Sequence, residues 1–511
     1  MLNIVPRDYQ NTIVETAKHS NTLVVLPTGI GKTLIALMLA VERIKAFPTS
    51  KILMLAPTRP LVEQHLETFT KHLPDLFADL QLFTGSVPPS QRKKIWQTAD
   101  IIFSTPQCIA NDLDMSLYSL NEVSLIIFDE AHRCLKNYDY TKVVNKYKSQ
   151  ASNPRILGLT ASPGSDYDIV NQICKHLDIQ EVEIRSRESN DVKPYIHELE
   201  FTKVEVPFPP EFIEMKVLLK RLYDDRVNQL KSRNLMFGPT NKITLLKLQA
   251  NLARQASQGH GQAMYGMSLT AQAIKIAHAL ELLETQTLSG LRTYLQGLMK
   301  QAEEKKSKGV QTLVKSPEFN AAFLSLTHLL AKKTEHPKLE KVLELVSQEL
   351  QNEKAKVLVF TQFRETALRV LDTLKETLNV RASIFIGQAK KASGGMSQKE
   401  QKSVIEKFKE GTINTLIATS IGEEGLDIPE VNAVIFYEPI PSAIRKIQRA
   451  GRTARHAPGK LFILVTKDTR DEIHHYAAAA REKKMYKTIE AVKRDLKSQP
   501  KPENKTLKDF T

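Results

Sequence analysis

The sequence holds few cysteines, few aromatic residues and no long apolar run. Its 511 residues include three cysteines and one tryptophan, and aromatic residues make up 6% of the chain. Cys108, Cys134 and Cys174 are far apart and odd in number, which argues against a disulfide framework and against a zinc site. No stretch of about 18 apolar residues occurs, so we expect no membrane span, and the first residues show no secretion signal. These absences favour a cytoplasmic protein of a prokaryotic or archaeal cell.

Acidic residues are outnumbered by basic ones. Lysine and arginine total 72 against 57 aspartate and glutamate residues, which gives a net charge of +15. A basic excess of this size favours a polyanionic partner, with nucleic acid ahead of membrane, although a generally lysine-rich surface is the alternative. The hydrophobic share of 41% and the charged share of 25% are those of a folded protein, and the length predicts two to four domains.

Short apolar runs separated by amphipathic stretches occur in two parts of the chain. Each run is rich in leucine or β-branched residues and ends in a polar residue, glycine or proline, which is typical of buried parallel strands with helices between them. We therefore predict two α/β domains, residues 1–200 and 336–480, each built on an open parallel sheet. The runs lie at residues 22–27, 51–57, 100–106, 124–130 and 155–162, and at 357–363, 382–388, 414–420, 432–439 and 460–466.

The segment between these domains, residues 201–335, has a helical pattern and an uneven charge. Residues 226–280 contain no aspartate or glutamate, but they contain Lys242, Lys247 and Arg254. This indicates a helical insert with one basic face, and a spacer whose lysines are merely solvated is the alternative. Residues 481–511 are rich in lysine, and we expect a basic helix followed by a flexible end.

A phosphate-binding loop follows the first apolar run. Residues 27–33 read PTGIGKT and precede a helical stretch, and the usual first glycine of such a loop is replaced by Leu26. Glycines let backbone N–H groups close around phosphates at a helix N-terminus. Lys32 would supply charge to the β- and γ-phosphates, and Thr33 can bind Mg²⁺. The predicted loop consists of Pro27, Thr28, Gly29, Ile30, Gly31, Lys32 and Thr33.

An acidic pair ends the fourth apolar run. Asp129 and Glu130 follow the residues LIIF. An acid at the end of a buried strand beside a phosphate loop can hold Mg²⁺ through water, and this role suits Asp129. Glu130 can orient and deprotonate an attacking water. Buried carboxylates without a role would be costly, which favours a catalytic pair.

With both motifs present, the chain resembles superfamily 2 helicases of the DEAH-box type. The further motifs of that family follow in its order. Residues 6–10 resemble the adenine-reading motif, which implies that Arg7 and Gln10 bind the nucleotide. The other matching segments are residues 56–61, 104–107, 160–162, 359–364, 418–427 and 448–455.

The resemblance implies two RecA-like domains with ATP and Mg²⁺ between them. The second domain would supply Arg452 and Arg455 as arginine fingers that stabilise the charge of phosphoryl transfer. Gln448 would position the water or the γ-phosphate, and Gly425 and Asp427 would contact the nucleotide, with Asp427 at the ribose. Because these groups are divided between two domains, hydrolysis would require closure of the cleft, and loss of the γ-phosphate would loosen it.

The resemblance also implies contacts to a nucleic-acid backbone. The matching positions are hydroxyls and arginines at loop ends, which suit phosphate contacts. A role as a helix cap or turn is the alternative for each of them. These positions are Thr58, Arg59, Thr105, Thr361, Arg364 and Thr419.

Within the superfamily, the chain is similar to the archaeal Hef helicase and its Fanconi-M-type relatives. The similarity rests on the helical insert together with LPTGIGKT, DEAHR, GLTASPG, GEEGLDIPEV and IQRAGRTAR. It implies an ATP-dependent helicase that remodels forks, flaps and four-way junctions, moves 3′ to 5′, and grips branched DNA with the insert. No E-R-K-x-x-x-D nuclease signature occurs, so we do not expect DNA cleavage.

Two other functions remain open at this point. RIG-I-like and Dicer-type helicases also carry a helical insert and act on double-stranded RNA, although the cysteine spacing argues against a zinc-bearing RNA-end domain. A non-catalytic scaffold is the other alternative, but it would require a damaged ATP site. The last residues also resemble a sliding-clamp-binding box, in which Leu507 and Phe510 would enter an apolar pocket, with Asn504 and Thr511 departing from the usual pattern.

Overall fold

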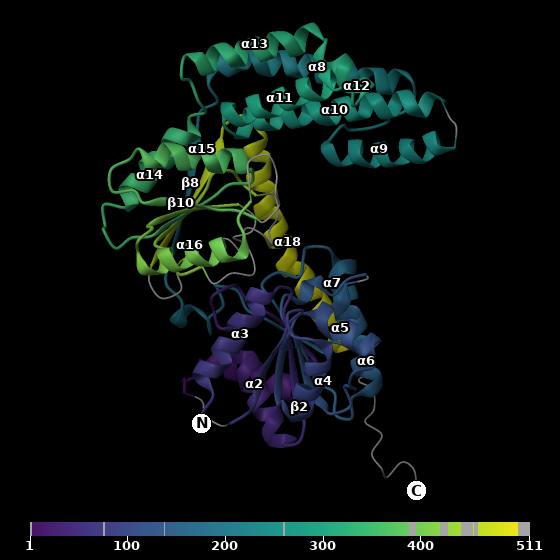
Figure 1. Ribbon diagram of the computed structural model, residues 1–511, viewed down its shortest axis with the longest axis vertical. Coiled ribbons are helices and arrows are strands. Elements are labelled where there is room, and N and C mark those ends of the chain that lie inside the picture. Colours follow the sequence, from purple (N-terminus) through teal and green to yellow (C-terminus); the bar gives the residue numbers. More distant parts are fainter. Residues whose placement is uncertain are drawn as a thin grey trace.

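The computed structural model describes residues 3–74, 77–136, 138–258, 261–387, 395–419, 428–440, 453 and 458–498. These residues form three bodies stacked along the long axis of the molecule (Figure 1). An α/β domain lies at one end, a second α/β domain lies in the middle, and a helical insert lies at the other end. No helix of the described part is long and apolar enough to cross a membrane.

The first sheet has seven parallel strands in the order β3-β4-β2-β5-β6-β1-β7. Its five inner strands coincide with the predicted runs and are buried along most or all of their length. The two edge strands were not predicted, because most of their residues are only half-buried and so do not form a continuous apolar run. The strands are β1 (Thr22–Val25), β2 (Lys51–Leu55), β3 (Leu80–Phe83), β4 (Ile101–Ser104), β5 (Val123–Phe128), β6 (Ile156–Thr160) and β7 (Glu181–Ile184).

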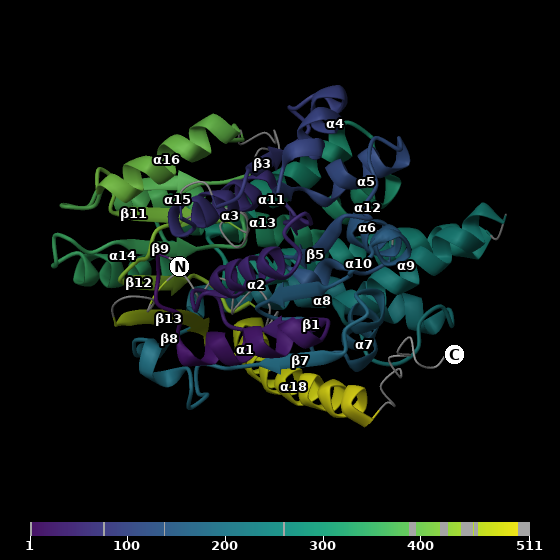
Figure 2. The same cartoon turned by 90° about the horizontal axis from the view of Figure 1, so that it is seen from below.

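Helices cover both faces of this sheet, as the connections between parallel strands require (Figure 2). One apolar core joins the sheet to α1, α2 and α3, and the other joins it to α5, α6 and α7. The helices of the domain are α1 (Asp8–His19), α2 (Lys32–Ala46), α3 (Arg59–His72), α4 (Pro89–Thr98), α5 (Pro106–Asp114), α6 (Asp139–Gln150) and α7 (Tyr167–His176).

The second sheet has six parallel strands in the order β10-β11-β9-β12-β13-β8. Strand β8 (Leu199–Val206) pairs with β13 (Gly459–Thr466) along its whole length. Residues 201–206 therefore belong to the second sheet, although the sequence placed them in the insert. They lack an apolar run because β8 is an edge strand with only two buried residues. The other strands are β9 (Val357–Phe360), β10 (Ala382–Phe385), β11 (Thr415–Ala418) and β12 (Ala433–Phe436).

The insert is a bundle of helices, and the second domain has helices on both faces of its sheet. The long helix α10 lies at the centre of the insert, with α8, α9 and α11 packed against it. The insert helices are α8 (Ile213–Ser232), α9 (Lys242–Ser257), α10 (Gly261–Thr285), α11 (Leu288–Glu303), α12 (Lys308–Val314) and α13 (Pro317–Ala331). Those of the second domain are α14 (Lys338–Glu349), α15 (Arg364–Lys375) and α16 (Gln398–Glu410).

A buried polar network fastens the insert to the second domain. Lys338 and Asp471 form an ion pair in which neither side chain is exposed to solvent. The ammonium group of Lys338 also donates to the carbonyl of Thr285 at the end of α10, at 3.1 Å. Beside it, the Gln286 amide donates to Glu438 Oε2 at 3.2 Å. Buried polar groups are costly to separate from their partners, so we infer that the insert and the second domain move as one unit.

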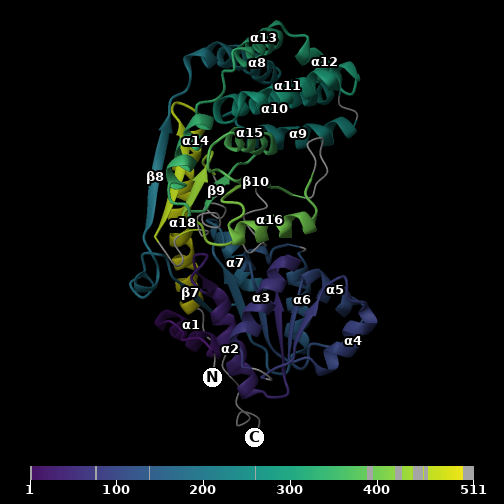
Figure 3. The same cartoon turned by 60° about the vertical axis from the view of Figure 1, so that its left-hand side comes forward.

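Helix α18 (Arg470–Ser498) continues from the second domain into the first (Figures 1 and 3). Met485, Ile489 and Val492, in its second half, are buried in an apolar core of the first domain. Its middle is largely exposed and contains the run AAAAREKK at 477–484, whose residues all favour helix without tertiary support. The sequence predicted a basic helix from residue 481 but not its burial in the first domain. Residues 499–511, including Leu507 and Phe510, lie outside the described part.

The Lys338–Asp471 pair should be a major contribution to the stability of the second domain. The substitution Asp471→Asn would leave the Lys338 ammonium buried without a counter-charge, so we expect the free energy of unfolding to fall by about 3–5 kcal/mol. Scanning calorimetry would measure the shift of the corresponding transition. The same substitution in the exposed pair Lys220–Asp224 should cost about 0–1 kcal/mol. Equal effects of the two substitutions would contradict the assignment.

Candidate functional site

The predicted phosphate loop joins β1 to α2 at the carboxyl edge of the first sheet. Gly29 and Gly31 adopt positive φ angles of 85° and 83°, which favour glycine, and the loop turns tightly into the first turn of α2. The Lys32 ammonium donates to the carbonyls of Leu26 at 3.0 Å and Pro27 at 3.2 Å. The Lys32 side chain therefore folds back onto the carbonyl groups of its own loop. The loop leads into the N-terminus of α2, and a glycine-rich loop at a helix N-terminus is an arrangement that binds anions.

Helix α1 supports this loop from behind. The Tyr9 hydroxyl donates to the carbonyl of Ile30 at 2.5 Å, and the Gln10 amide donates to that of Gly31 at 3.4 Å. The backbone N–H of Arg7 donates to Gln10 Oε1 at 2.9 Å, which fixes the orientation of that amide. Gln10 thus lies against the loop, and the Arg7 guanidinium lies 3.2 Å from the Tyr9 hydroxyl.

The acidic pair lies where β5 ends, two strands from β1 in the sheet. The Asp129 backbone is held on both sides, since its N–H donates to the Leu55 carbonyl at 2.8 Å and its carbonyl accepts from the Tyr140 hydroxyl at 2.6 Å. Glu130 has a left-handed backbone with φ of 49°, which is rare outside glycine and costs free energy. Both carboxylates are buried, with Asp129 6% and Glu130 8% exposed.

A histidine that the sequence did not single out lies between the two predicted Mg²⁺ ligands. His65 Nε2 lies 2.8 Å from Asp129 Oδ2, and His65 Nδ1 lies 3.4 Å from the Thr33 hydroxyl. Burial alone would raise the pKa of Asp129, but the adjacent His65 and Lys32 outweigh it and hold that pKa below its usual range. The carboxylate is thus kept charged and oriented beside the phosphate loop.

His132 connects the acidic pair to the end of β6. Its Nδ1 lies 3.2 Å from Glu130 Oε2 and 3.0 Å from the Thr160 hydroxyl. The Ser162 backbone N–H also donates to the Thr160 hydroxyl, at 3.1 Å, and the Ser162 hydroxyl donates to the sulfur of Met485. A continuous chain of polar contacts therefore runs from Glu130 to helix α18.

The predicted backbone-contact residues follow neighbouring strands. Thr58 follows β2 and Thr105 follows β4, which are adjacent in the first sheet, and each is the N-cap residue of the next helix. Thr361 follows β9 and Thr419 follows β11, which are adjacent in the second sheet. The carboxyl ends of parallel strands meet at one edge, so each pair lies together. The buried Thr58 hydroxyl has no hydrogen-bond partner within the described residues.

Arg59 belongs to an ionic contact between the two α/β domains. Its Nε donates to Glu63 at 2.7 Å, and Lys402 of α16 lies 3.1 Å from the same carboxylate. These residues line a hollow of about 550 Å³ between α3 and α16. Burial raises the pKa of Glu63, but the hydrogen bonds from Arg59 and Lys402 lower it by more than burial raises it. The carboxyl pKa is therefore below its usual range. In the second domain, Arg364 donates to the Gly387 carbonyl at 3.0 Å.

The three predicted contacts of the insert differ in their surroundings. Lys242 is paired with Glu281 of α10 at 2.9 Å. Burial raises the pKa of Glu281, but hydrogen bonds to His278 and Lys242 outweigh this and lower it to about 2. Lys247 and Arg254 are exposed on α9. Helix α9 lies on the side of the insert that faces the first domain (Figures 1 and 3).

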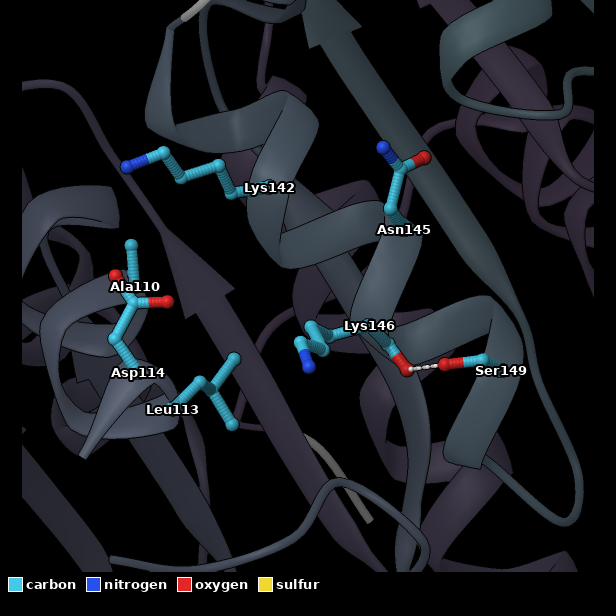
Figure 4. Close-up of a pocket in the computed structure, with 7 residues that line it drawn as sticks. All are labelled: Ala110, Leu113, Asp114, Lys142, Asn145, Lys146 and Ser149. Carbon is cyan, nitrogen blue, oxygen red and sulfur yellow. Dashed lines mark hydrogen bonds between the residues drawn. The ribbon is translucent and has the colours of Figure 1, made fainter. Parts of the chain in front are cut away.

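The remaining predicted site residues are not in the described part of the chain. This applies to Gly425, Asp427, Gln448, Arg452 and Arg455. A surface hollow of about 410 Å³ between α5 and α6 lies apart from the site, since none of its lining residues belongs to the loop or the acidic pair (Figure 4).

His65 and Tyr140 were missed from the sequence, and Tyr9 was included in the motif at residues 6–10 without a role of its own; only His65 left a signal. His65 is the polar member of the buried stripe of α3 that includes Val62 and Phe69. A histidine in such a stripe, one helix after a predicted strand end, is a candidate for the site. Tyr9 and Tyr140 act through their hydroxyls, and their spacing in the sequence reveals neither contact.

Three protein families match consecutive parts of the chain. Residues 7–170 match "DEAD/DEAH box helicase", residues 211–335 match "Putative ATP-dependent RNA helicase, helical bundle", and residues 337–457 match "Helicase conserved C-terminal domain". The order agrees with the three bodies of the fold.

Individual relatives match nearly the whole chain. The crystal structure of the Pyrococcus furiosus Hef helicase domain is 40% identical, with a TM-score of 0.70, and the match covers 93% of this chain and 98% of that one. A "Putative ATP-dependent RNA helicase" of Methanocaldococcus jannaschii is 37% identical over 94% of this chain. The ATP-dependent DNA helicase fml1 of Schizosaccharomyces pombe is 33% identical over 96%. The chain spans 60% of the length of each of these last two.

Gly31 should be irreplaceable in the phosphate loop. A Cβ at this position would lie 2.3 Å from Gln10 Nε2, on a backbone with φ of 83°. We expect Gly31→Ala to weaken nucleotide binding at least about tenfold, because the loop or Gln10 must shift. Titration with a fluorescent nucleotide would measure this. Gly85→Ala is the control, since a Cβ there meets nothing within 4 Å, and a Gly31→Ala protein with wild-type affinity would contradict the prediction.

Proposed function

Because the chain belongs to the DEAD/DEAH-box helicases and has the architecture of the Hef helicase domain, we propose that it hydrolyses ATP and uses the cycle to remodel branched DNA. The observation that carries this proposal is the joint placement of two features. A phosphate loop and an acidic pair lie at the carboxyl edge of the first sheet, and an insert with an acid-free segment is fastened to the second domain.

The residues at the carboxyl edge fit ATP and Mg²⁺. The loop that contains Gly29 and Gly31, at the start of α2, suits phosphates. When a nucleotide binds, the Lys32 ammonium would leave the loop carbonyls that it contacts here and would bind phosphate oxygens instead. Thr33 and Asp129 would hold Mg²⁺, which would neutralise charge on the phosphates. Glu130, buried next to Asp129, would orient the attacking water and accept its proton.

The second domain would complete the site when the cleft closes. By family resemblance, Arg452 and Arg455 would stabilise charge on the γ-phosphate, Gln448 would position it, and Gly425 and Asp427 would contact the nucleoside. The contact from Glu63 to Lys402 joins the domains next to Arg59, so closure and strand binding would act on the same helix, α3.

The insert supports a branched substrate. Lys247 and Arg254 are exposed on α9, on the side that faces the first domain, and residues 226–280 contain no acid that would repel a second phosphate backbone. The strand-contact loops of Thr58, Thr105, Thr361 and Thr419 would bind one strand. A duplex arm on α9 would then be held at a fixed position relative to the second domain.

Other features stay predictions from the sequence alone. Movement in the 3′ to 5′ direction follows only from the family resemblance. A sliding clamp bound through Leu507 and Phe510 rests on the terminal residues, which lie outside the described part. A cytoplasmic location in a prokaryotic or archaeal cell rests on the absence of targeting signals in the sequence.

Forked DNA should be the strongest activator of ATP hydrolysis. We expect the ATPase rate to be higher with a three-way fork than with single-stranded DNA, linear duplex or duplex RNA, measured at two salt concentrations. Glu130→Gln should lower the fork-stimulated rate by about 10²–10⁴-fold while retaining nucleotide and fork binding. Strongest stimulation by duplex RNA would overturn the DNA assignment. An unchanged rate in Glu130→Gln would overturn the catalytic one.

Helix α9 should contribute phosphate contacts to fork binding. For Lys247→Gln combined with Arg254→Gln, the slope of log K against log salt should become shallower by up to about 0.9 for each lost contact. Fluorescence anisotropy with a labelled fork would measure it. Lys315→Gln combined with Lys332→Gln, exposed residues that follow α12 and α13, is the charge-matched control. Equal slopes for the two double variants would contradict a role of α9 in DNA binding and would favour the alternative that the insert is a spacer.

A further inference from the structure

His65 uses both of its ring nitrogens within the nucleotide site. Nε2 lies 2.8 Å from Asp129 Oδ2, Nδ1 lies 3.4 Å from the Thr33 hydroxyl, and the residue is 5% exposed. With Nε2 donating to the carboxylate, Nδ1 can accept from the hydroxyl, so one orientation of the ring serves both partners. A single side chain thus bridges the two residues proposed to bind Mg²⁺.

The His65 contact orients the Asp129 carboxylate together with a hydrogen bond from the Glu130 backbone and the charge of Lys32. The Asp129 backbone is already fixed by Leu55 and Tyr140, so only the side-chain torsions are left to be determined. Thr33 lies in the first turn of α2, whose position the phosphate loop determines. Hydrogen bonds of this kind orient metal ligands, and their loss commonly weakens metal binding by 10–100-fold.

The helix that carries His65 also carries the residues proposed to meet the nucleic acid. Helix α3 begins at Arg59, immediately after Thr58, and His65 follows about 9 Å further along its axis. Val62 and Phe69 are buried along the same stripe of the helix as His65, so a shift at one end of α3 would carry His65 with it. Glu63, between these positions, contacts Lys402 of the second domain. Figure 3 shows α3 on the side of the first domain that faces α16.

We propose that His65 is a positioning residue that orients Thr33 and Asp129 for Mg²⁺ and transmits movement of α3, caused by strand binding at Thr58 and Arg59, to those two ligands. The inference rests on the proposed function, because it takes Thr33 and Asp129 as the Mg²⁺ ligands. It adds a direct path, within one helix, from the nucleic-acid face to the metal site. The contacts of His132 with Glu130 and Thr160 form a separate path that does not include His65.

Glutamine can replace the chemistry of His65, whereas alanine cannot. A glutamine amide has a donor for the carboxylate and an acceptor for the hydroxyl. We therefore compare His65→Ala and His65→Gln with the wild type, and use His72→Ala, in the last turn of the same helix, as the matched control. Circular dichroism and thermal melting of each variant establish that it is folded before binding is measured.

The first measurement is the binding of a fluorescent ADP analogue as Mg²⁺ is titrated from an EDTA baseline. In His65→Ala, the Mg²⁺ concentration for half-maximal binding should rise about tenfold or more, while binding in EDTA stays within twofold of the wild type. His65→Gln should return to within about threefold of the wild type. An unchanged Mg²⁺ midpoint in His65→Ala, or an equal loss in EDTA, would overturn the positioning role.

The second measurement is the change in ADP-analogue affinity caused by a saturating single-stranded DNA oligonucleotide, with Mg²⁺ saturating. Linkage requires any such coupling to be mutual between strand and nucleotide. We expect His65→Ala to reduce the wild-type coupling factor at least about threefold, and His72→Ala to leave it unchanged. Intact coupling in His65→Ala would overturn the transmission role. Absence of coupling in the wild type would count against strand-dependent nucleotide binding in the proposed function, while the Mg²⁺ titration would still decide the positioning role.

Discussion

The direction of the strands is the constraint on which this molecule depends. All strands of the described sheets are parallel, so every functional loop leaves the same edge of its sheet. In the first sheet, β1, β5 and β6 present the phosphate loop, the acidic pair and Thr160, and β2 and β4 present Thr58 and Thr105. Because β2 and β5 are neighbours, the helix that follows β2 lies close enough to Asp129 for His65 to reach it. Strand order therefore determines which loops can interact.

Sequence reasoning succeeded where local chemistry determines the structure. The inner strands are continuous apolar runs because they are buried on both faces, and the loop around Gly29 and Gly31 requires glycine at two positions. It failed where exposure weakens the pattern, as in the edge strands β3, β7 and β8. It also failed for contacts between distant segments. The buried stripe of α3 marks His65 as a candidate, but the residues around it do not identify Asp129 and Thr33 as its neighbours.

The ends of the helical segments show the same limit. The pattern of α18 predicts a helix, yet only the fold shows that Met485 packs beneath Ser162. Lys242, Lys247 and Arg254 look equivalent in the sequence and all three are exposed, but the first of them forms an ion pair with Glu281. Charge that is counted along the chain therefore overstates the charge that is available to a partner.

From the attachment of the insert we infer two moving parts rather than three. Lys338, Thr285 and Gln286 join the insert to the second domain through buried polar contacts, and such contacts do not slide easily. Among the described residues, the first domain meets that combined unit through the contact of the half-buried Glu63 with Lys402 and through α18. When the nucleotide cleft closes or opens, the insert would therefore move together with the second domain, and α9 would move with it.

The burial of α18 also has a consequence for how the protein is made. The first domain leaves the ribosome early, but the surface around Val170 and Ile173 is covered by Met485, Ile489 and Val492, which follow β7 by roughly 300 residues. At about 5–20 residues per second, that surface stays open for roughly 15–60 s of synthesis. The core of the first domain is complete only when α18 has packed against it.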